Sequence, residues 1–296
     1  MLVRIGAASL NFPDLLMTRG EYQFKPEVPF TSGMEFAGEV VAAEPGCGFS
    51  PGDKVVGGNK TGAFAELASL HPKALSHSPR IAEPQAAAMG AAYTTAYTGL
   101  VELCGLKPGQ WVLVTGASGG VGLAACDLAK AMGAKVIAAT GTHTKRAAIL
   151  RACPAIDEVI VSEGRFREAV EEITGGALCD VVFDCVGGDV FDECTRCVAF
   201  AGKLVVVGFT SGRIADIATN IPLIKGFSVV GLRAGEYARR LPERGAVIKA
   251  AVHELAEAGR INPAIDRVLP LSRWREGFEA MQNRELVGKL VFEPGS

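Results

Sequence analysis

The chain has 296 residues, 49% hydrophobic and 21% charged, which is enough for about two domains with sizeable cores. The formal net charge of −2 gives no electrostatic support for a nucleic-acid or anionic-membrane partner, and we expect neither. The sequence shows no apolar run long enough to span a membrane and no evident signal peptide, so no membrane association is expected.

The eight cysteines are scattered along the chain, and several lie in apolar runs. This usage is typical of a reduced intracellular protein rather than of a disulfide framework, so we expect a cytoplasmic location. Cys194 and Cys197 form the one suggestive pair, in a segment that we predict to be helical. No second cysteine pair or histidine pair accompanies them in the sequence, so burial in a core is a better interpretation than metal or redox chemistry.

The first 90 residues carry short candidate strands separated by glycine and proline, including a turn cluster at 45–52. This pattern predicts a mostly β domain with irregular connections. The predicted strands are 3–9, 36–43, 53–57 and 64–70.

From about residue 91, apolar strands alternate with helices, which predicts an α/β fold with a doubly wound parallel sheet covered on both faces. The predicted helices are 91–104, 120–132, 144–152, 165–174 and 189–199, and the predicted strands are 111–115, 135–140, 158–161, 180–185, 203–208 and 227–232.

The carboxyl-terminal segments are too few to form a domain, so we expect them to rejoin the amino-terminal β domain. The predicted domains are therefore 1–90 with 259–296, and 91–258. The terminal segments are helices 245–258 and 272–283 and strands 265–269 and 289–292.

The most informative segment is a short strand, 112–114, followed by the glycine turn 116–122 and a helix that continues to Met132. A turn of this kind exposes backbone N–H groups, and the helix dipole favours a phosphate at the same place. Gly119 and Gly120 would let a pyrophosphate approach the backbone, and Gly122 would let the helix pack closely on the strand. We read A-S-G-G-V-G as a variant of the dinucleotide fingerprint; a glycine turn without a ligand is the alternative.

The second strand of this unit, 135–139, indicates which dinucleotide is bound. A site selective for NADH usually carries Asp or Glu near the end of this strand, and none is present here. Lys145 and Arg146 follow instead, and cations suit a 2′-phosphate, so we expect NADPH rather than NADH. Alternatively, both are solvated residues in the first turn of a helix, where a cation opposes the dipole unless an anion compensates.

Seven segments in order resemble the zinc-free quinone oxidoreductases of the medium-chain dehydrogenase/reductase superfamily. The resemblance implies a GroES-like catalytic domain, a Rossmann domain, NADPH as cofactor and a homodimer, which we expect to form through strand 227–232. The segments are L-N-F-P-D (10–14), P-F-T-S-G-M-E-F-A-G-E-V (29–40), P-G-D-K-V (51–55), A-S-G-G-V-G-L-A-A (117–125), D-C-V-G-G (184–188), L-V-V-V-G-F-T-S-G (204–212) and G-K-L-V (288–291).

No metal is expected from the resemblance. The positions that carry zinc ligands in zinc-dependent members hold Asn11, Met34 and Thr94, which are not a zinc set. Without a Lewis acid the hydride acceptor must already be activated, so the expected activity is NADPH-dependent reduction of a quinone or another α,β-unsaturated carbonyl compound. Two alternatives stay open: an enoyl-thioester reductase, and a non-catalytic NADPH-binding protein with a structural or regulatory role.

The resemblance also implies roles for individual residues. Asn11 would lie by the nicotinamide and substrate, Tyr22 would line the substrate mouth, and Thr94 would contact the nicotinamide. A turn-forming Asn11 and a packed Tyr22 are the alternatives, and a solvated Lys289 is the better interpretation of that residue than a cofactor contact. The residues expected to bind the cofactor are Ala117, Ser118, Gly119, Gly120, Val121, Gly141, Thr142, Lys145, Cys185, Val186, Phe209, Ser211 and Leu232.

The sequence departs from the family pattern in two places. Family members usually have further strands before the segment that begins at Val3. We therefore expect a catalytic domain that is shortened at the amino terminus; either the start of the sequence is misassigned or truncated, or the domain lacks part of its sheet. Ser162 stands where a tyrosine near the adenosine is common, so we expect a differently lined adenosine site.

Overall fold

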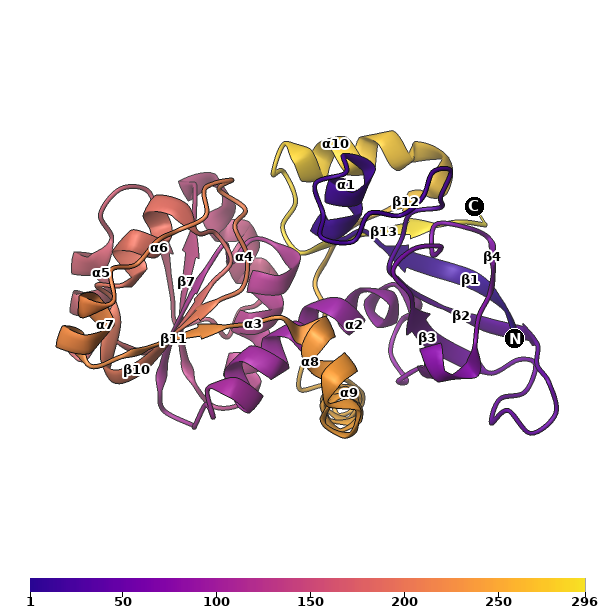
Figure 1. The fold of residues 1–296 in the computed structure, drawn as a ribbon, viewed down its shortest axis with the longest axis horizontal. Helices are drawn as coiled ribbons and strands as arrows, with labels where there is room; N and C mark the ends of the chain where they lie inside the picture. Colours follow the sequence, from indigo (N-terminus) through magenta and orange to yellow (C-terminus); the bar gives the residue numbers. More distant parts are fainter. Residues whose placement is uncertain (296) are drawn as a thin grey trace. The chain divides into compact units, whose positions relative to one another are not determined.

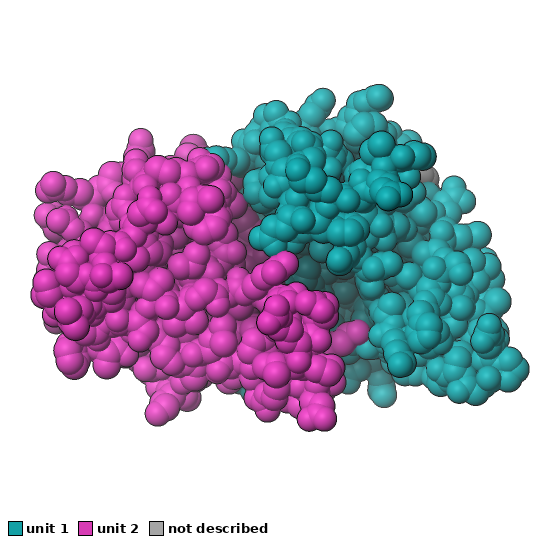
Figure 2. Space-filling view, in the orientation of Figure 1, with its two compact units in different colours: residues 1–91, 253–296 teal, residues 92–252 magenta. Residues whose placement is uncertain are grey.

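The computed structural model describes residues 1–295, whose contacts divide them into two units, coloured separately in Figure 2. Unit 1 is Met1–Ala91 together with the segment that begins at His253, and unit 2 is Ala92–Val252. The two boundaries fall inside helices, α2 (Glu83–Tyr97) and α9 (Pro242–Glu257).

Unit 1 is built on a seven-stranded mixed sheet in which β12 and β13 are parallel and the other pairs are antiparallel (Figure 1). Its order is β12-β13-β1-β2-β3-β5, and β4 also pairs with β1. Because β13 pairs with β1, the prediction that the last strands rejoin the amino-terminal sheet is confirmed. The strands are β1 (Leu2–Ser9), β2 (Glu35–Ala42), β3 (Lys54–Gly58), β4 (Leu67–Ser69), β5 (Leu75–His77), β12 (Ile265–Pro270) and β13 (Lys289–Glu293).

Unit 2 contains a six-stranded parallel sheet in the order β11-β10-β9-β6-β7-β8 (Figure 1). Numbered along the chain from β6, this is the Rossmann order of a doubly wound sheet, so the predicted fold of this part is confirmed. The strands are β6 (Trp111–Thr115), β7 (Lys135–Thr140), β8 (Glu158–Val161), β9 (Cys179–Asp184), β10 (Val198–Val206) and β11 (Ser228–Gly231).

Helices join the strands in both units. Besides α2 and α9, they are α1 (Phe12–Thr18), η1 (Pro72–Ala74), η2 (Thr98–Leu103), α3 (Gly120–Ala131), η3 (His143–Lys145), α4 (Arg146–Ala152), α5 (Arg167–Ile173), α6 (Gly188–Cys194), α7 (Asn220–Lys225), α8 (Ala234–Arg240), η4 (Leu271–Arg273) and α10 (Trp274–Gln282). In the part of the chain described here, none of them is long and apolar enough to cross a membrane.

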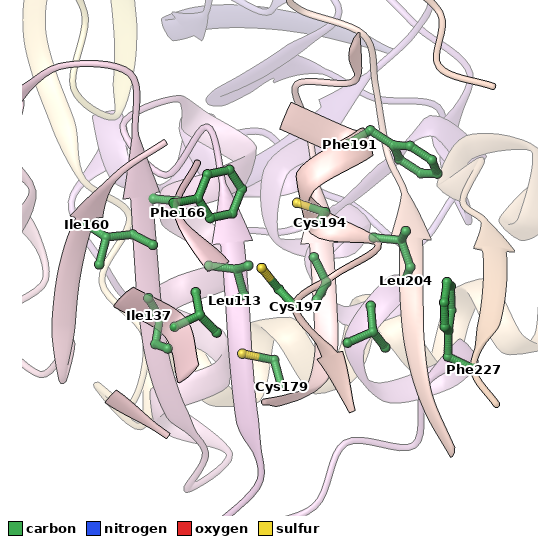
Figure 3. Packing of buried hydrophobic residues seen from close by; sticks show 14 residues of the cluster. Leu113, Ile137, Ile160, Phe166, Cys179, Phe191, Cys194, Cys197, Leu204 and Phe227 are labelled. Carbon is green, nitrogen blue, oxygen red and sulfur yellow. The ribbon is translucent and has the colours of Figure 1, made fainter. Parts of the chain in front are cut away.

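Both faces of the parallel sheet are buried. Val112, Leu113 and Val114 are consecutive on β6, point to alternate faces, and are all fully buried. Figure 3 shows one face, where side chains from α5 and α6 meet the strands and the sulfur atoms of Cys194 and Cys197 lie among them. The interpretation of this cysteine pair as core residues is therefore confirmed.

Several predicted boundaries were wrong. The helix predicted at 91–104 begins at Glu83, because Pro84 suits a first turn and alanines follow. The helix predicted at 189–199 ends at Cys194, because Val198 already pairs with Cys179 as part of β10. Of the strand predicted at 64–70, only Leu67–Ser69 forms.

Five elements were missed: α1, η1, β5, α7 and α8. The signal for α1 was present in the sequence. Asn11 is its N-cap, Pro13 lies in the first turn, and Asp14 at the third helical position accepts a hydrogen bond from the Asn11 backbone N–H, at 2.9 Å.

Candidate cofactor and active-site residues

The residues predicted to bind the cofactor lie in turns that follow the carboxyl ends of the unit 2 strands; we call this side of the sheet its carboxyl edge. Because the strands are parallel, the turns that follow their carboxyl ends meet at the same edge, which is where ligands bind in open α/β sheets. These turns follow β6, β7, β9, β10 and β11 and contain Ala117–Val121, Gly141–Lys145, Cys185–Val186, Phe209–Ser211 and Leu232.

The turn after β6 is tight. Gly116 has a positive φ of 61°, and the Gly119 N–H donates to its carbonyl oxygen at 2.9 Å. A Cβ on Gly122 would lie 2.3 Å from the same oxygen, so no larger residue fits there. Gly122 thus lets the start of α3 lie close to the backbone of the turn, at Gly116, rather than to the strand. A Cβ on Gly119 would meet nothing nearer than 3.4 Å.

The amino terminus of α3 is open to an anion. Its N-cap is Gly119, and no side chain accepts a hydrogen bond from the first helical N–H groups. Those groups have no partner inside a helix either, and the helix dipole adds positive potential at the same end. A pyrophosphate therefore fits this cradle of glycine and backbone donors.

The turn after β7 carries hydroxyl groups and a lysine. A Cβ on Gly141 would have no atom within 4 Å, and the exposed Thr142 and Thr144 hydroxyl oxygens are 3.0 Å apart. Lys145 is half-buried in η3, while Arg146 begins α4 and pairs with Glu158 at 3.9 Å. Two cations therefore follow β7 closely, and Lys145 lies with Gly141 and Thr142 in the turn where a 2′-phosphate would bind.

Ser162 begins the segment after β8, and its backbone N–H donates to the Thr140 carbonyl oxygen at 2.8 Å. The Thr140 hydroxyl is buried and has no hydrogen-bond partner among residues 1–295. An unbonded buried hydroxyl is unusual in a native core.

The turn after β9 packs against the turn after β10. A Cβ on Gly187 would lie 2.8 Å from the Phe209 ring, and the Ser211 N–H donates to the Val186 carbonyl oxygen at 2.9 Å. Leu232 lies against η2, where a Cβ on Gly99 would be 2.8 Å from its side chain. The structure thus brings the predicted residues of these turns together within unit 2.

Asp184 and Thr115 were missed, although Asp184 belongs to the D-C-V-G-G segment. The Asp184 carboxylate is fully buried and accepts hydrogen bonds from the Thr115 hydroxyl, the Val186 N–H and the Gly187 N–H. Burial raises the pKa of Asp184, and the three donors oppose that rise. Three donors around one carboxylate stabilise its ionised form.

Asn11 belongs to a buried polar cluster in unit 1. Its Nδ2 donates to Glu35 Oε1 at 2.9 Å and to the Ser9 carbonyl oxygen at 3.2 Å. Its Oδ1 accepts from Lys289 Nζ at 2.6 Å. Both amide hydrogens are therefore used inside the cluster, and what Asn11 can still offer is one acceptor position on Oδ1.

Lys289 is 6% exposed, so the interpretation as a solvated lysine was wrong. Its Nζ lies 3.0 Å from Glu35 Oε1, and the two side chains form a buried ion pair. Glu35 Oε2 accepts from the Ala91 N–H of α2 at 2.7 Å, and a Cβ on Gly90 would lie 2.9 Å from that oxygen. Sequence gave no sign of this pair, because its members are 254 residues apart.

Asp14 is the second acid of the cluster. Burial raises its pKa to about 6, although its hydrogen bonds and the Lys289 charge oppose the rise. Its oxygens accept from the backbone N–H groups of Asn11 at 2.9 Å and Gly33 at 3.2 Å. Asp14 thereby holds the segment after β1 beside the segment that leads into β2.

The other two residues predicted to be catalytic lie in separate units. Tyr22 is half-buried between α1 and β2 in unit 1. Thr94 is half-buried on α2 in unit 2, and its carbonyl oxygen accepts from the Thr98 hydroxyl at 2.6 Å. Within residues 1–295, no group of three or more His, Cys, Asp or Glu residues is arranged to hold a metal ion.

Comparisons with known proteins agree with this arrangement. Residues 1–80 match the family described as "Alcohol dehydrogenase GroES-like domain", and residues 120–257 match "Zinc-binding dehydrogenase". Quinone oxidoreductase-like protein 2 homolog of Nematostella vectensis is 38% identical over 296 residues, which cover 98% of this chain and 80% of that protein.

Solved structures show the same fold. A probable oxidoreductase from Mycobacterium abscessus superposes with a TM-score of 0.90 at 34% identity, covering 99% of this chain and 89% of that one. Quinone oxidoreductase of Escherichia coli, solved in complex with NADPH, gives a TM-score of 0.87 at 30% identity, covering 99% and 91%. The predicted fold class, a Rossmann sheet with a mostly β GroES-like part, is confirmed by these matches.

Proposed function

Because the chain belongs to the quinone oxidoreductase-like branch of the medium-chain dehydrogenase/reductase superfamily, we propose that it is an NADPH-dependent reductase of quinones or other activated α,β-unsaturated carbonyl compounds. The observation that carries the proposal is the uncapped amino terminus of α3 behind Gly119, at the carboxyl edge of a parallel sheet. The Escherichia coli relative with NADPH supports the choice of cofactor.

In this proposal each turn of unit 2 contacts a different part of the cofactor. The backbone from Ala117 to Val121 would hold the pyrophosphate, Gly141, Thr142 and Lys145 would surround the 2′-phosphate, and Cys185 and Val186 would lie along the nicotinamide ribose. Phe209, Ser211 and Leu232 would border the dinucleotide. When bound, NADPH would supply the hydride, and the protein's part is to orient the two reactants and exclude water.

The proposal is for a reaction without a catalytic metal, because Asn11, Met34 and Thr94 provide no zinc ligand set. A quinone or enone suits such a site, since its conjugated system takes up the charge that the hydride delivers. We assign contacts with the nicotinamide and substrate to Asn11, Tyr22 and Thr94. Asn11 would act as an acceptor, because its own hydrogens bond Glu35 and Ser9.

The test is NADPH oxidation by the purified chain with three acceptor classes: quinones, enones and enoyl thioesters, each with and without a metal chelator. The proposal expects turnover of a quinone or enone that the chelator leaves unchanged. Turnover confined to thioesters would replace it with an enoyl-thioester reductase. NADPH binding without turnover of any class would favour the non-catalytic alternative, and loss of turnover with chelator would overturn the metal-free reaction.

The proposal also includes a small-molecule substrate, no nucleic-acid partner and a cytoplasmic location. The location rests on the eight cysteines, all of which are free thiols in the structure. Fluorescence microscopy of a tagged chain in its own cell, with fractionation as a control, would test that part.

A further inference from the structure

Two turns at the carboxyl edge of the unit 2 sheet are joined by two buried side chains. Thr115 is the last residue of β6 and Asp184 the last residue of β9, and both are fully buried. The Thr115 hydroxyl donates to Asp184 Oδ1 and accepts from the Cys185 N–H at 3.1 Å. The same carboxylate accepts from Val186 at 3.1 Å and Gly187 at 3.0 Å.

These bonds begin where the backbone pairing of the two strands stops. The ladder between β6 and β9 runs from Val112 opposite Val181 to Val114 opposite Phe183. One residue further along, side chains replace the backbone as the link between the strands. The position of the turn after β9 relative to the glycine turn therefore depends on Thr115 and Asp184.

The two turns are also in close contact. A Cβ on Gly116 would lie 3.3 Å from Val186 and 3.4 Å from Cys185, so the two turns are close neighbours at this point. A shift of the second turn by a few tenths of an ångström would change the distance between the pyrophosphate cradle and the residues assigned to the nicotinamide ribose.

We infer that Asp184 and Thr115 are positioning residues for the cofactor: they set the spacing between the glycine turn and the Cys185–Gly187 turn and touch no ligand themselves. The inference rests on the proposed function, because that function assigns the two turns to two parts of NADPH. It has a specific consequence: ligands that span both turns need the pair, whereas a ligand confined to the adenosine end does not.

The test compares two probes by calorimetric titration. NADPH would span both turns. Adenosine 2′,5′-bisphosphate would reach the turn after β7 and, through its 5′-phosphate, the glycine turn, but not the Cys185–Gly187 turn. Thr115→Val removes the hydroxyl and keeps the branched shape that suits a strand. Thr115→Ser keeps the hydroxyl and serves as the conservative rescue. Asp184→Asn places an NH2 group against a backbone N–H, whichever way the amide turns.

Asp180 offers a matched control at the opposite end of the same two strands. Its carboxylate accepts from the Trp111 N–H at 2.8 Å and from Gln110 Nε2 at 3.3 Å. Asp180→Asn weakens the contact between β6 and β9 at the end of the strands opposite the cofactor turns. Thermal unfolding of every variant shows how much stability each change removes.

The expected result is that Thr115→Val and Asp184→Asn weaken NADPH binding about tenfold or more, the size of one lost buried hydrogen bond. The affinity for adenosine 2′,5′-bisphosphate should stay within about twofold, and Thr115→Ser and Asp180→Asn should leave the ratio of the two affinities unchanged. Equal weakening of both probes, or no change in a folded Thr115→Val, would overturn the inference.

If the proposed function is wrong, the titrations give a different result. In that case the unsubstituted chain binds neither probe, and the inference falls with it. A chain that binds NADPH and loses nothing on Thr115→Val keeps the proposed function and loses only the inference. If Asp184→Asn does not fold, Thr115→Val and Thr115→Ser alone decide the outcome.

Discussion

At the scale of single residues, buried polar side chains form two hydrogen-bonded groups. Lys289, Glu35 and Asn11 form one such group, and Thr115 and Asp184 form another. Each group joins segments that are distant in the sequence. Buried charges of this kind are costly to leave unpaired, so removing one member should have a larger effect than removing a surface charge.

Lys289→Met tests the buried ion pair. It would leave the Glu35 carboxylate buried without its cation, and we expect a loss of about 3–5 kcal/mol in the free energy of unfolding. Lys54→Met is the matched control, because Lys54 and Glu39 are also 3.0 Å apart but lie on the surface. That change should cost within about 1 kcal/mol. Equal losses in urea denaturation would contradict the account of Lys289.

Asp14 predicts a pH dependence with a definite sign. Its pKa rises from 3.8 to about 6 on folding, so the folded chain binds this proton more tightly than the unfolded chain. The stability that it contributes is present below pH 3.8 and lost as the pH rises through about 6, a change of about 3 kcal/mol.

Asp14→Asn removes this titration. The free energy of unfolding of the unsubstituted chain minus that of the variant should therefore fall between about pH 4 and about pH 7. Urea denaturation across this range measures the difference, which also cancels the titration of groups that do not interact with Asp14. A difference that is flat or grows with pH would refute the raised pKa.

At the scale of elements, the glycine turn and α3 form the proposed pyrophosphate site, and two of their glycines should behave oppositely. Gly122→Ala places a Cβ 2.3 Å from the Gly116 oxygen, so we expect strong destabilisation of unit 2. Gly119→Ala meets nothing nearer than 3.4 Å, so the chain should stay folded while NADPH binding weakens about tenfold or more.

Thermal unfolding and NADPH titration of both variants separate the two effects. Gly119→Ala with an unchanged unfolding temperature and unchanged NADPH affinity would show that the turn does not hold the cofactor. Gly122→Ala that unfolds like the unsubstituted chain would show that the tight turn is not required.

The elements also show how far sequence reasoning reached. The β6–α3 unit was predicted almost residue for residue, because an apolar strand, a glycine turn and the helix that follows are all local signals. α7 and α8 were missed, because they are short and lack a strong cap: Thr219 and Arg233 make no side-chain capping bond. The burial of Lys289 could not be seen, because its partners come from β2 and from the segment after β1.

At the scale of the whole molecule, we expect a homodimer in which β11 pairs with its copy. β11 is an edge strand of the unit 2 sheet, Val229 on it is 38% exposed, and the preceding Leu223 and Ile224 are exposed as well. An apolar edge of this kind favours pairing with another chain.

Val229→Lys should convert the dimer to a monomer in sedimentation at micromolar concentration, because it places a charge on the paired edge. Val247→Lys is the control, since Val247 is an exposed apolar residue on α9 rather than on the sheet. It should leave the dimer intact. An unsubstituted chain that sediments as a monomer would contradict the expected assembly.

The central claim is that the carboxyl edge of the unit 2 sheet binds NADPH and reads its 2′-phosphate through Lys145. The most direct measurement is a calorimetric titration of the chain with NADPH and with NADH, repeated for Lys145→Ala and, as a control, Arg146→Ala. We predict tighter binding of NADPH than of NADH and a preference that Lys145→Ala reduces about tenfold. Arg146→Ala should reduce it less, because Lys145 lies in η3 within the turn after β7, whereas Arg146 begins α4. Binding of neither nucleotide, or equal binding of both that Lys145→Ala does not alter, would contradict the claim.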